Sequence, residues 1–370
     1  MRLCIATPLY PPELGGPATY ARALEVGLSA RYGVEVTVVK FQDVRRFPKV
    51  IRHLMYVYIL FRASKGADVI LVLDPVSTGL PAWCVSRLRR IPLVVKIVGD
   101  YAWEQARQRY GVRKSLDDFI HDKDVHVLVQ FLRAVQSFVT KGAKRVIVPS
   151  RYLGAIIKSW GVPLSTVSVV YNAVPVGLPG TLPPSIQETA RPHIVTVGRL
   201  VPWKNIGGIV DALVQLESST GTLIIVGDGP DRNSIEKYAT TRLGNRVLFT
   251  GTLSHADTQA VIADADVFVL NSTYEGLSHL LIEALELGVP IIATSAGGNT
   301  EVIEDGVTGR VIPVHDSSAL ADALASVFTD AAEAKRMAAR GKKSASRFTQ
   351  EKMLEGTYAV LASVLPETAV

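Results

Sequence analysis

Short apolar runs alternate with longer stretches of helical periodicity along the whole chain. The runs are rich in Val, Ile and Leu and are bounded by Gly, Pro, Asp or Asn, which is typical of buried strands. We expect strands at residues 3–6, 34–39, 68–73, 93–98, 145–148 and 168–170, and in the second half at 193–197, 222–226, 246–249, 267–270, 290–293 and 309–312. Strands that alternate with helices form parallel sheets covered by helices. The pattern therefore predicts an α/β fold of doubly wound parallel sheets.

A segment without periodicity divides this pattern in two. Residues 175–192 are rich in Pro and Gly, which is typical of a linker. We expect one Rossmann-like domain over residues 1–174 and a second over 193–351. The tail at 345–365 is amphipathic, and we expect its helix, about residues 352–370, to cross back to the first domain. Two such sheets leave a cleft at the carboxyl ends of their strands, where these folds bind ligands.

Residues 271–300 carry the densest candidate chemistry. After the strand at 267–270 come a polar loop, an apolar helix at about 279–287, a further strand and the pair Gly297-Gly298. Free N–H groups at a strand–loop–helix joint suit an anion, and Gly276 lets a ligand approach the backbone. Glu275 lies in the loop and Glu283 inside the apolar helix, with seven residues between them, and Glu283 needs a partner there such as a ribose hydroxyl pair. An ordinary βαβ unit with a solvated Glu275 is the alternative.

Two cations follow the first strand of the second half. Arg199 and Lys204 lie five positions apart across a loop, so both can converge on one diphosphate. Gly229 lies in a glycine-rich exit from the next strand, and the backbone up to Leu253, after the strand that follows, can meet a nucleotide base. In the first half, Gly15 and Gly16 precede a helix, where they either hold a phosphate or form a plain turn.

Carboxylates at two other places have competing interpretations. Asp100 and Glu104 follow the fourth strand, where either can orient an acceptor hydroxyl or act as a base; Asp100 is equally a helix N-cap. Asp264-Ala265-Asp266 matches a metal-binding DxD superficially. It spans a helix end and a strand start, so we expect Asp266 to cap or pair and expect no metal site.

The net charge of +6 conceals an asymmetry between the halves. Residues 1–175 hold 25 Lys and Arg against 12 Asp and Glu, which gives +13, whereas residues 176–370 hold 15 against 22, which gives −7. The first half is therefore expected to meet an anionic partner. Residues 40–66 suggest a basic amphipathic helix for an anionic membrane surface, with Arg45, Arg46, Lys49 and Arg52 as contacts. A domain helix with a solvated basic edge is the alternative. Nucleic acid is disfavoured because no aromatic residues are interleaved for stacking.

The composition of the chain argues against several further classes of protein. The chain is 48% hydrophobic and 20% charged, which is typical of a globular protein. Cys4 and Cys84 lie in apolar surroundings, so we expect a reducing compartment and no structural metal. The first twelve residues suggest a strand and not a signal peptide, and no apolar run reaches the length of a membrane span. A cytoplasmic protein, peripheral on the inner membrane face, is the expectation.

Four segments in order resemble a known family: GRLVPWKN (198–205), GDGPD (227–231), EGLSHLLIE (275–283) and GVPIIATSAGGNTEVIEDGVTG (288–309). They are similar to the retaining glycosyltransferases of family 4, which have the GT-B fold and an E-x7-E motif. The resemblance covers nearly the whole chain. It implies a nucleotide-diphosphate sugar, such as a UDP- or GDP-sugar, bound mainly by the second domain. It also implies a lipid-linked or oligosaccharide acceptor bound mainly by the first.

The resemblance implies a role for each motif residue. Arg199 and Lys204 would neutralise the diphosphate as the glycosidic bond breaks, without a metal or other cofactor. Glu275 would hold hydroxyls of the transferred sugar and Glu283 the ribose. The amides of Gly276, Leu277, Ser278 and His279, with Gly16 opposite, would line the phosphates and sugar.

Two departures from the family pattern matter. Many relatives have a histidine where this chain has Gly99-Asp100, and many have EGFG where it has Glu275-Gly276-Leu277-Ser278. A nucleotide-sugar 2-epimerase of the same fold, or a non-catalytic nucleotide-sugar-binding subunit, are the competing interpretations. The sequence identifies neither the sugar, the nucleotide, the acceptor nor the oligomeric state.

Overall fold

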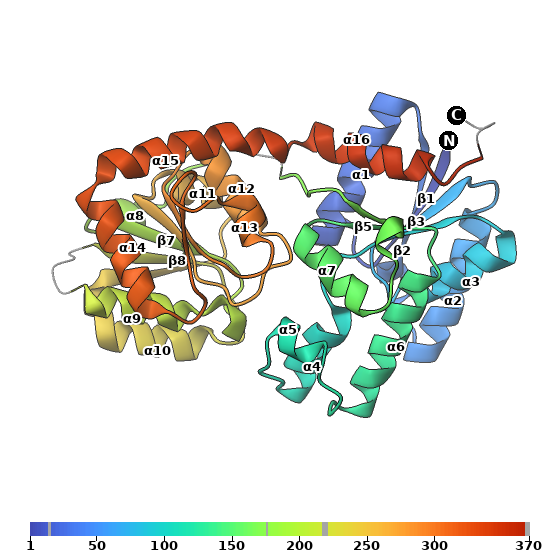
Figure 1. Cartoon of the computed structure of the whole chain (residues 1–370), viewed down its shortest axis with the longest axis horizontal. Helices are drawn as coiled ribbons and strands as arrows, with labels where there is room; N and C mark the ends of the chain where they lie inside the picture. Colours follow the sequence, from blue (N-terminus) through green and yellow to red (C-terminus); the bar gives the residue numbers. More distant parts are fainter. Residues whose placement is uncertain (14–15, 175–176, 217–220, 367–370) are drawn as a thin grey trace. The chain divides into compact units, whose positions relative to one another are not determined.

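The computed structural model describes residues 1–13, 16–174, 177–216 and 221–366. The chain forms two compact units: unit 1 comprises Met1–Asn172 with Gln350–Val370, and unit 2 comprises Ala173–Thr349. Each unit is built around one six-stranded sheet with helices on its faces (Figure 1). All strand pairs are parallel, so the predicted class of fold is confirmed.

Unit 1 has the strand order β2-β1-β3-β4-β5-β6. Its strands are β1 (Arg2–Thr7), β2 (Glu35–Lys40), β3 (Val69–Val72), β4 (Leu93–Lys96), β5 (Arg145–Val148) and β6 (Val167–Val169). Its helices are α1 (Gly16–Tyr32), α2 (Lys49–Ala63), α3 (Gly79–Arg89), α4 (Tyr101–Tyr110), α5 (Leu116–Phe119), α6 (Val127–Lys141), α7 (Arg151–Ser159) and α16 (Gln350–Ala362).

Unit 2 has the strand order β12-β11-β10-β7-β8-β9. Its strands are β7 (His193–Val197), β8 (Thr222–Val226), β9 (Val247–Gly251), β10 (Val267–Leu270), β11 (Ile291–Thr294) and β12 (Arg310–Ile312). Its helices are α8 (Pro184–Gln187), α9 (Ile206–Gln215), α10 (Arg232–Leu243), α11 (His255–Ala263), α12 (His279–Leu287), α13 (Asn299–Val302), α14 (Ser317–Thr329) and α15 (Ala331–Ser344). The central strands are buried on both faces, which explains their continuous apolar runs.

Every expected strand is present, with ends shifted by a few residues. In each sheet the chain order reverses once, between β1 and β3 in unit 1 and between β7 and β10 in unit 2. The segment expected to be a linker contains the short helix α8. The tail helix is shorter than expected: a 3₁₀ turn at Ala345–Arg347 precedes it, and α16 begins at Gln350, where the chain passes from unit 2 to unit 1.

Helix α16 packs on α1 inside unit 1. The rings of Tyr32 and Tyr358 stack with centroids 4.1 Å apart, and the hydroxyls of Tyr20 and Thr357 lie 2.9 Å apart. A Cβ on Gly27 would lie 2.4 Å from Cδ1 of Leu354, so the lack of a side chain there allows the close approach. The expectation that the last helix crosses back to the first domain is confirmed.

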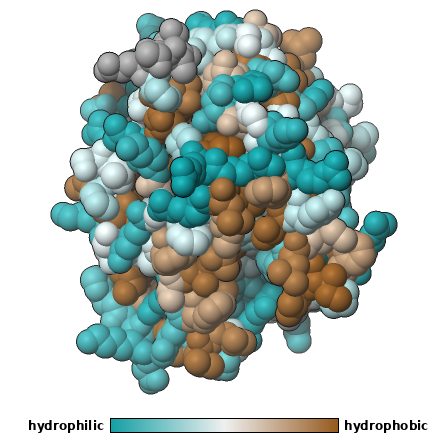
Figure 2. Space-filling model, turned by 90° about the vertical axis from the view of Figure 1, so that its right-hand side faces the viewer, coloured by the Kyte–Doolittle hydropathy of each residue, from teal (hydrophilic) through white to brown (hydrophobic). Residues whose placement is uncertain are grey.

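Helix α2 is apolar on two faces. Tyr56 and Leu60 are buried, whereas Val50 is 74% exposed and Leu54 is 67% exposed. The helix begins only at Lys49, so Arg45 and Arg46 precede it. Figure 2 views the side of unit 1 that carries α2 and α3 in Figure 1, and patches of apolar residues lie on this face among hydrophilic ones. Within the described residues, no helix is both long and apolar enough to cross a membrane.

Candidate functional site in unit 2

The loops that follow β7, β8 and β9 are joined through their backbones. Gly198 N–H donates to the carbonyl of Val226 at 2.9 Å, Leu200 N–H to Asp228 at 3.0 Å, and Gly227 N–H to Gly251 at 2.8 Å. A Cβ on Gly229 would lie 2.2 Å from the carbonyl oxygen of Leu200. Glycine at 229 therefore allows the second loop to pack on the first, which fixes the loop that carries Arg199 and Lys204.

The loop after β10 is anchored to the loop after β7. Thr273 N–H donates to the carbonyl of Trp203 at 2.7 Å, and the side-chain amide of Asn271 donates to the carbonyl of Asn205 at 3.0 Å. These loops leave the two neighbouring strands between which the chain order reverses. In open α/β sheets, ligands bind beyond the carboxyl ends of the strands at this point.

An ion pair spans the two loops. The ammonium Nζ of Lys204 donates to Oε1 of Glu275 at 2.6 Å, with side chains 15% and 14% exposed. The structure thus brings together two site residues that are distant in sequence. Arg199 lies on the same loop, is exposed, and makes no hydrogen bond or ion pair within the described part of the chain.

Glu283 lies inside α12, as expected from the sequence. The residue is only 6% exposed, and its Oε2 is buried without a hydrogen-bond partner. Burial raises the pKa of this carboxyl, while the nearby His255 lowers it. A buried carboxyl oxygen without a hydrogen-bond donor lowers the stability of the fold. This atom is therefore suited to accept a hydrogen bond from a ligand hydroxyl.

The other residues of unit 2 that the sequence singled out lie in loops and at the start of α12. Gly276 and Leu277 are in the loop before α12, and His279 is its first helical residue. Ser278 is its N-cap, with Oγ accepting from Leu281 N–H at 3.4 Å. Leu253 is half-buried in the loop between β9 and α11.

In unit 1, Asp100 caps α4. Its carboxylate accepts from Trp103 N–H at 2.9 Å, and burial raises its pKa. Burial, with the charges of Asp100 and Asp74, raises the pKa of Glu104 to about 7. Asp74 was not expected from the sequence; it follows β3 beside the chain reversal, is buried, and has a pKa raised by that burial. The signal for it in the sequence is an acidic residue directly after an apolar run.

The loop before α1 and the basic segment of unit 1 are described only in part. Gly15 lies outside the described residues, and Gly16 begins α1 and is exposed. Arg45 is held by Glu13 at 2.9 Å, while Arg46 and Arg52 lie over the rings of Phe47 and Phe41. Lys49 begins α2, and its side chain is outside the described part. Arg45 is therefore already neutralised within the chain.

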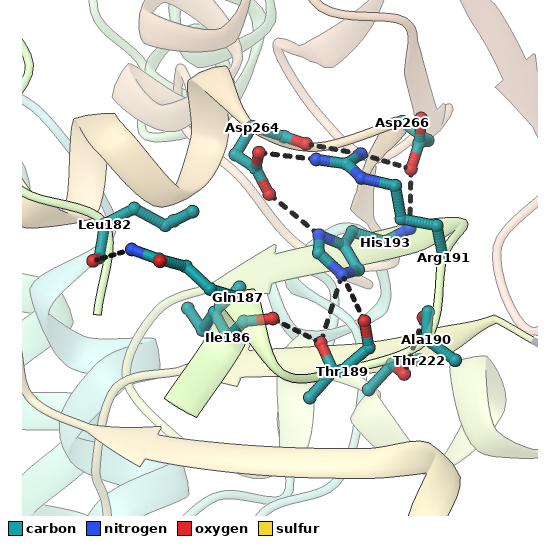
Figure 3. Close-up of polar contacts among 10 residues, drawn as sticks. All are labelled: Leu182, Ile186, Gln187, Thr189, Ala190, Arg191, His193, Thr222, Asp264 and Asp266. Carbon is teal, nitrogen blue, oxygen red and sulfur yellow. Dashed lines mark hydrogen bonds and ion pairs between the residues drawn. The ribbon is translucent and has the colours of Figure 1, made fainter. Parts of the chain in front are cut away.

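The DxD-like segment belongs to a polar cluster at the start of β7 (Figure 3). Arg191 pairs with Asp264 at 2.5 Å and with Asp266 at 2.7 Å, so the expected pairing of Asp266 is confirmed. His193 Nδ1 lies 2.7 Å from Asp264, and its Nε2 lies 3.0 Å from Oγ1 of Thr189. This arrangement resembles a hydrolytic triad, but the Thr189 hydroxyl donates to the carbonyl of Ile186 at 2.7 Å. Its proton is thus directed away from the histidine, and the cluster is structural.

Family models match both halves of the chain. Residues 183–344 match "Glycosyl transferases group 1", and residues 15–173 match "Glycosyl transferase 4-like domain". The chain is also similar over its whole length to solved structures. An Anabaena protein, HepE, in complex with UDP has a TM-score of 0.77 at 21% identity, covering 98% of this chain and 100% of that one. Sucrose-phosphate synthase from Thermosynechococcus elongatus has a TM-score of 0.78 at 21% identity, with 98% of each chain covered.

Curated relatives match over a shorter region. Alpha-D-kanosaminyltransferase of Streptomyces kanamyceticus is 33% identical over 151 residues, which are 40% of this chain and 39% of the relative. A GDP-mannose-dependent alpha-(1-6)-phosphatidylinositol monomannoside mannosyltransferase of Mycobacterium tuberculosis is 33% identical over 163 residues, 41% of this chain and 42% of the relative. The matched regions span half or less of these relatives. By both of its domains and by its fold, the chain belongs to the GT-B glycosyltransferases.

Proposed function

We propose that this protein is a retaining, metal-independent glycosyltransferase that moves a sugar from a nucleotide diphosphate to a lipid-linked or glycan acceptor. The observation that carries the proposal is the Lys204–Glu275 pair, because it joins a cation and an acid at the chain reversal of unit 2. The names of a UDP complex and of a GDP-mannose-dependent relative support a nucleotide-sugar donor.

Each group has a defined task in this proposal. The donor diphosphate competes with Glu275 for Lys204, and Arg199 supplies a second cation that no carboxylate of the described chain neutralises. Negative charge grows on the diphosphate as the glycosidic bond breaks, so fixed cations stabilise the transition state more than the ground state. Glu275, once released, accepts from hydroxyls of the transferred sugar.

Glu283 is assigned to the ribose. Its unpaired Oε2 accepts from a ribose hydroxyl, and this hydrogen bond replaces the missing donor in the unliganded site. A protonated carboxyl can donate to the second hydroxyl, which agrees with its raised pKa. On the acceptor side, Glu104 suits a base better than Asp100, because Asp100 already caps α4.

We place the protein peripherally on the cytoplasmic face of an anionic membrane. Support comes from α2, where Val50, Ile51, Leu54 and Tyr58 are exposed and basic residues lie close by in sequence. Exposed apolar side chains gathered on one helix are typical of membrane or protein contacts. Arg46 is exposed and can meet lipid headgroups, whereas Arg45 is committed to Glu13.

Incubation of the purified protein with radiolabelled UDP- and GDP-sugars, with and without acceptor extracts and with EDTA, tests the proposal. Transfer of label to an acceptor in EDTA, with the anomeric configuration kept, is the expected result. Free epimerised sugar nucleotide would indicate a 2-epimerase, and stabilisation against heat without turnover would indicate a binding subunit.

A further inference from the structure

A groove of about 1080 Å³ opens at the amino-terminal edge of the unit 1 sheet. Its floor includes Asp68 before β3, Pro92 before β4 and Lys144 before β5, and residues 363–366 after α16 form one wall. This edge is opposite to the carboxyl ends of the strands, where the residues assigned to transfer chemistry lie. The groove therefore has no part in the proposed function.

Four cations line this groove: Arg87, Arg90, Lys141 and Lys144. All four are exposed, and within the described residues none of them forms an ion pair with a carboxylate. The single acid of the lining, Asp68, accepts from Arg2 N–H at 2.6 Å and also faces the Arg2 guanidinium. The groove thus concentrates positive charge that the chain does not neutralise.

The corresponding edge of unit 2 is built differently. There Arg191 lies between Asp264 and Asp266, and its charge is neutralised within the chain (Figure 3). A pocket of about 460 Å³ on that edge is lined mainly by apolar residues. The pocket of unit 2 therefore has one lysine, Lys335, in its lining, whereas four cations without a carboxylate partner in the described chain line the groove of unit 1.

Helix ends explain only part of this arrangement. Arg87 and Lys141 lie in the last turns of α3 and α6, where the helix dipole favours a cation. Arg90 and Lys144 lie beyond those turns, and Arg90 has a left-handed backbone with φ 57°. Glycine is the favoured residue in that conformation at a helix end, so an arginine there lowers stability. Its exposed side chain forms no hydrogen bond or ion pair within the described chain that would offset this cost.

We infer that this groove binds the phosphate group of a ligand. Arginine forks and lysine ammonium groups are the side chains that recognise phosphate oxygens. The volume exceeds what a bare phosphate fills, and Ile91, Pro92, Val364 and Leu365 supply apolar wall for the rest of the ligand. The same chemistry fits a phospholipid headgroup or a soluble phosphate ester.

Inorganic pyrophosphate, titrated calorimetrically at low salt into the full chain, tests the inference. The test variant is Arg90→Gly with Lys144→Ala, and the matched control is Arg109→Ala with Lys158→Ala, which removes two exposed cations of the same unit. We expect the groove variant alone to lose one class of pyrophosphate site, or to weaken it roughly tenfold or more. Arg90→Gly also relieves the left-handed backbone, so we expect the thermal midpoint not to fall.

Lys204→Ala separates this site from the donor site. We expect it to remove the other class of pyrophosphate site and to leave the groove site unchanged, so either assignment can fail without the other. Equal pyrophosphate binding by the groove variant and its control would overturn the inference.

Sedimentation with phosphatidylcholine vesicles, with and without phosphatidylglycerol, distinguishes a phospholipid headgroup from a soluble phosphate ester. If the groove variant binds phosphatidylglycerol vesicles more weakly than the wild type, the site is assigned to a lipid headgroup. If it binds the vesicles equally well but has lost pyrophosphate binding, the site is assigned to a soluble phosphate ester.

Discussion

Lys204 and Glu275 are half-buried partners at 2.6 Å, and each lacks another charged partner in the described chain. Replacing Lys204 by Ala removes a cation from the proposed diphosphate site. We expect transfer to fall by about 10²–10³-fold, as for other groups that stabilise transition-state charge. Turnover at saturating donor, measured beside Lys237→Ala as an exposed-cation control in unit 2, checks this. Near-normal turnover would refute the role given to Lys204.

Lys96 is a charged residue that the proposed function does not use. It ends β4, is fully buried, donates from Nζ to the carbonyl of Val170 at 3.3 Å and lies over the ring of Tyr20. Burial lowers its pKa from 10.5 to about 7. At a pH between about 7 and 10.5, Lys96 is protonated in the unfolded chain and neutral in the folded chain. The free energy of unfolding therefore rises as the pH rises from about 7 towards 10.5, and it is lowest where the ammonium is buried.

Replacing Lys96 by Met should remove this pH dependence. The wild-type chain is expected to gain up to about 3 kcal/mol of stability between about pH 7 and about pH 9.5, and the variant to gain little. Below about pH 7 the variant should be the more stable protein, because a buried ammonium is replaced by an apolar side chain of similar size. Urea unfolding at both pH values, with Lys158→Met as an exposed control, measures the difference. Parallel pH profiles for all three proteins would contradict the assignment to Lys96.

These residues differ in how far the sequence could anticipate them. Lys204 and Glu275 follow apolar runs directly, and in a parallel sheet the residues after strands gather at one edge. Lys96 also ends an apolar run, but its burial depends on Tyr20 and the carbonyl of Val170, which belong to segments far away in the chain. Likewise, the unpaired Oε2 of Glu283 depends on packing that no local pattern reveals.

At the scale of elements, α2 shows why periodicity left two interpretations open. Apolar residues occupy the buried face, with Tyr56 and Leu60, and also the exposed face, with Leu54 and Tyr58. A helix that is apolar on both faces has no single stripe that identifies its partner. The contacts of the basic residues depend on where the helix begins. Arg45 precedes α2 and forms an ion pair with Glu13.

The exposed face of α2 is expected to enter the membrane interface. Leu54→Ser with Tyr58→Ser should weaken partitioning into anionic vesicles roughly tenfold or more, because two apolar side chains no longer leave water on binding. Leu164→Ser with Val169→Ser, also exposed in unit 1, is the matched control. Arg46→Glu should act mainly at low salt, whereas Arg45→Glu also breaks the pair with Glu13. Identical partitioning of the test and control variants would show that this face has another purpose.

At the scale of the molecule, unit 1 consists of two chain segments and unit 2 of one. The strand pattern anticipated both sheets, because each strand is marked by its own residues. The extent of the last helix was less well anticipated, because its start coincides with the passage between units, and apolar periodicity continues through the break. The final segment supplies buried residues to unit 1, among them Leu354, Thr357 and Leu361.

Removing residues 350–370 should therefore destabilise unit 1 selectively. The deletion uncovers Gly27 and Tyr32 on α1 and removes the partner of the Tyr20 hydroxyl, while every strand of unit 2 remains. We expect the calorimetric transition of unit 1 to shift to lower temperature or disappear, because several buried apolar side chains are lost at about 1.5–3 kcal/mol each. The transition of unit 2 should persist and should still move upward when UDP or GDP, whichever belongs to the donor that is used, is added, since Lys204, Glu275 and Glu283 all lie in that unit. A chain shortened only by residues 367–370 is the control, because it keeps all of α16. If both deletions unfold alike, α16 does not complete the core of unit 1.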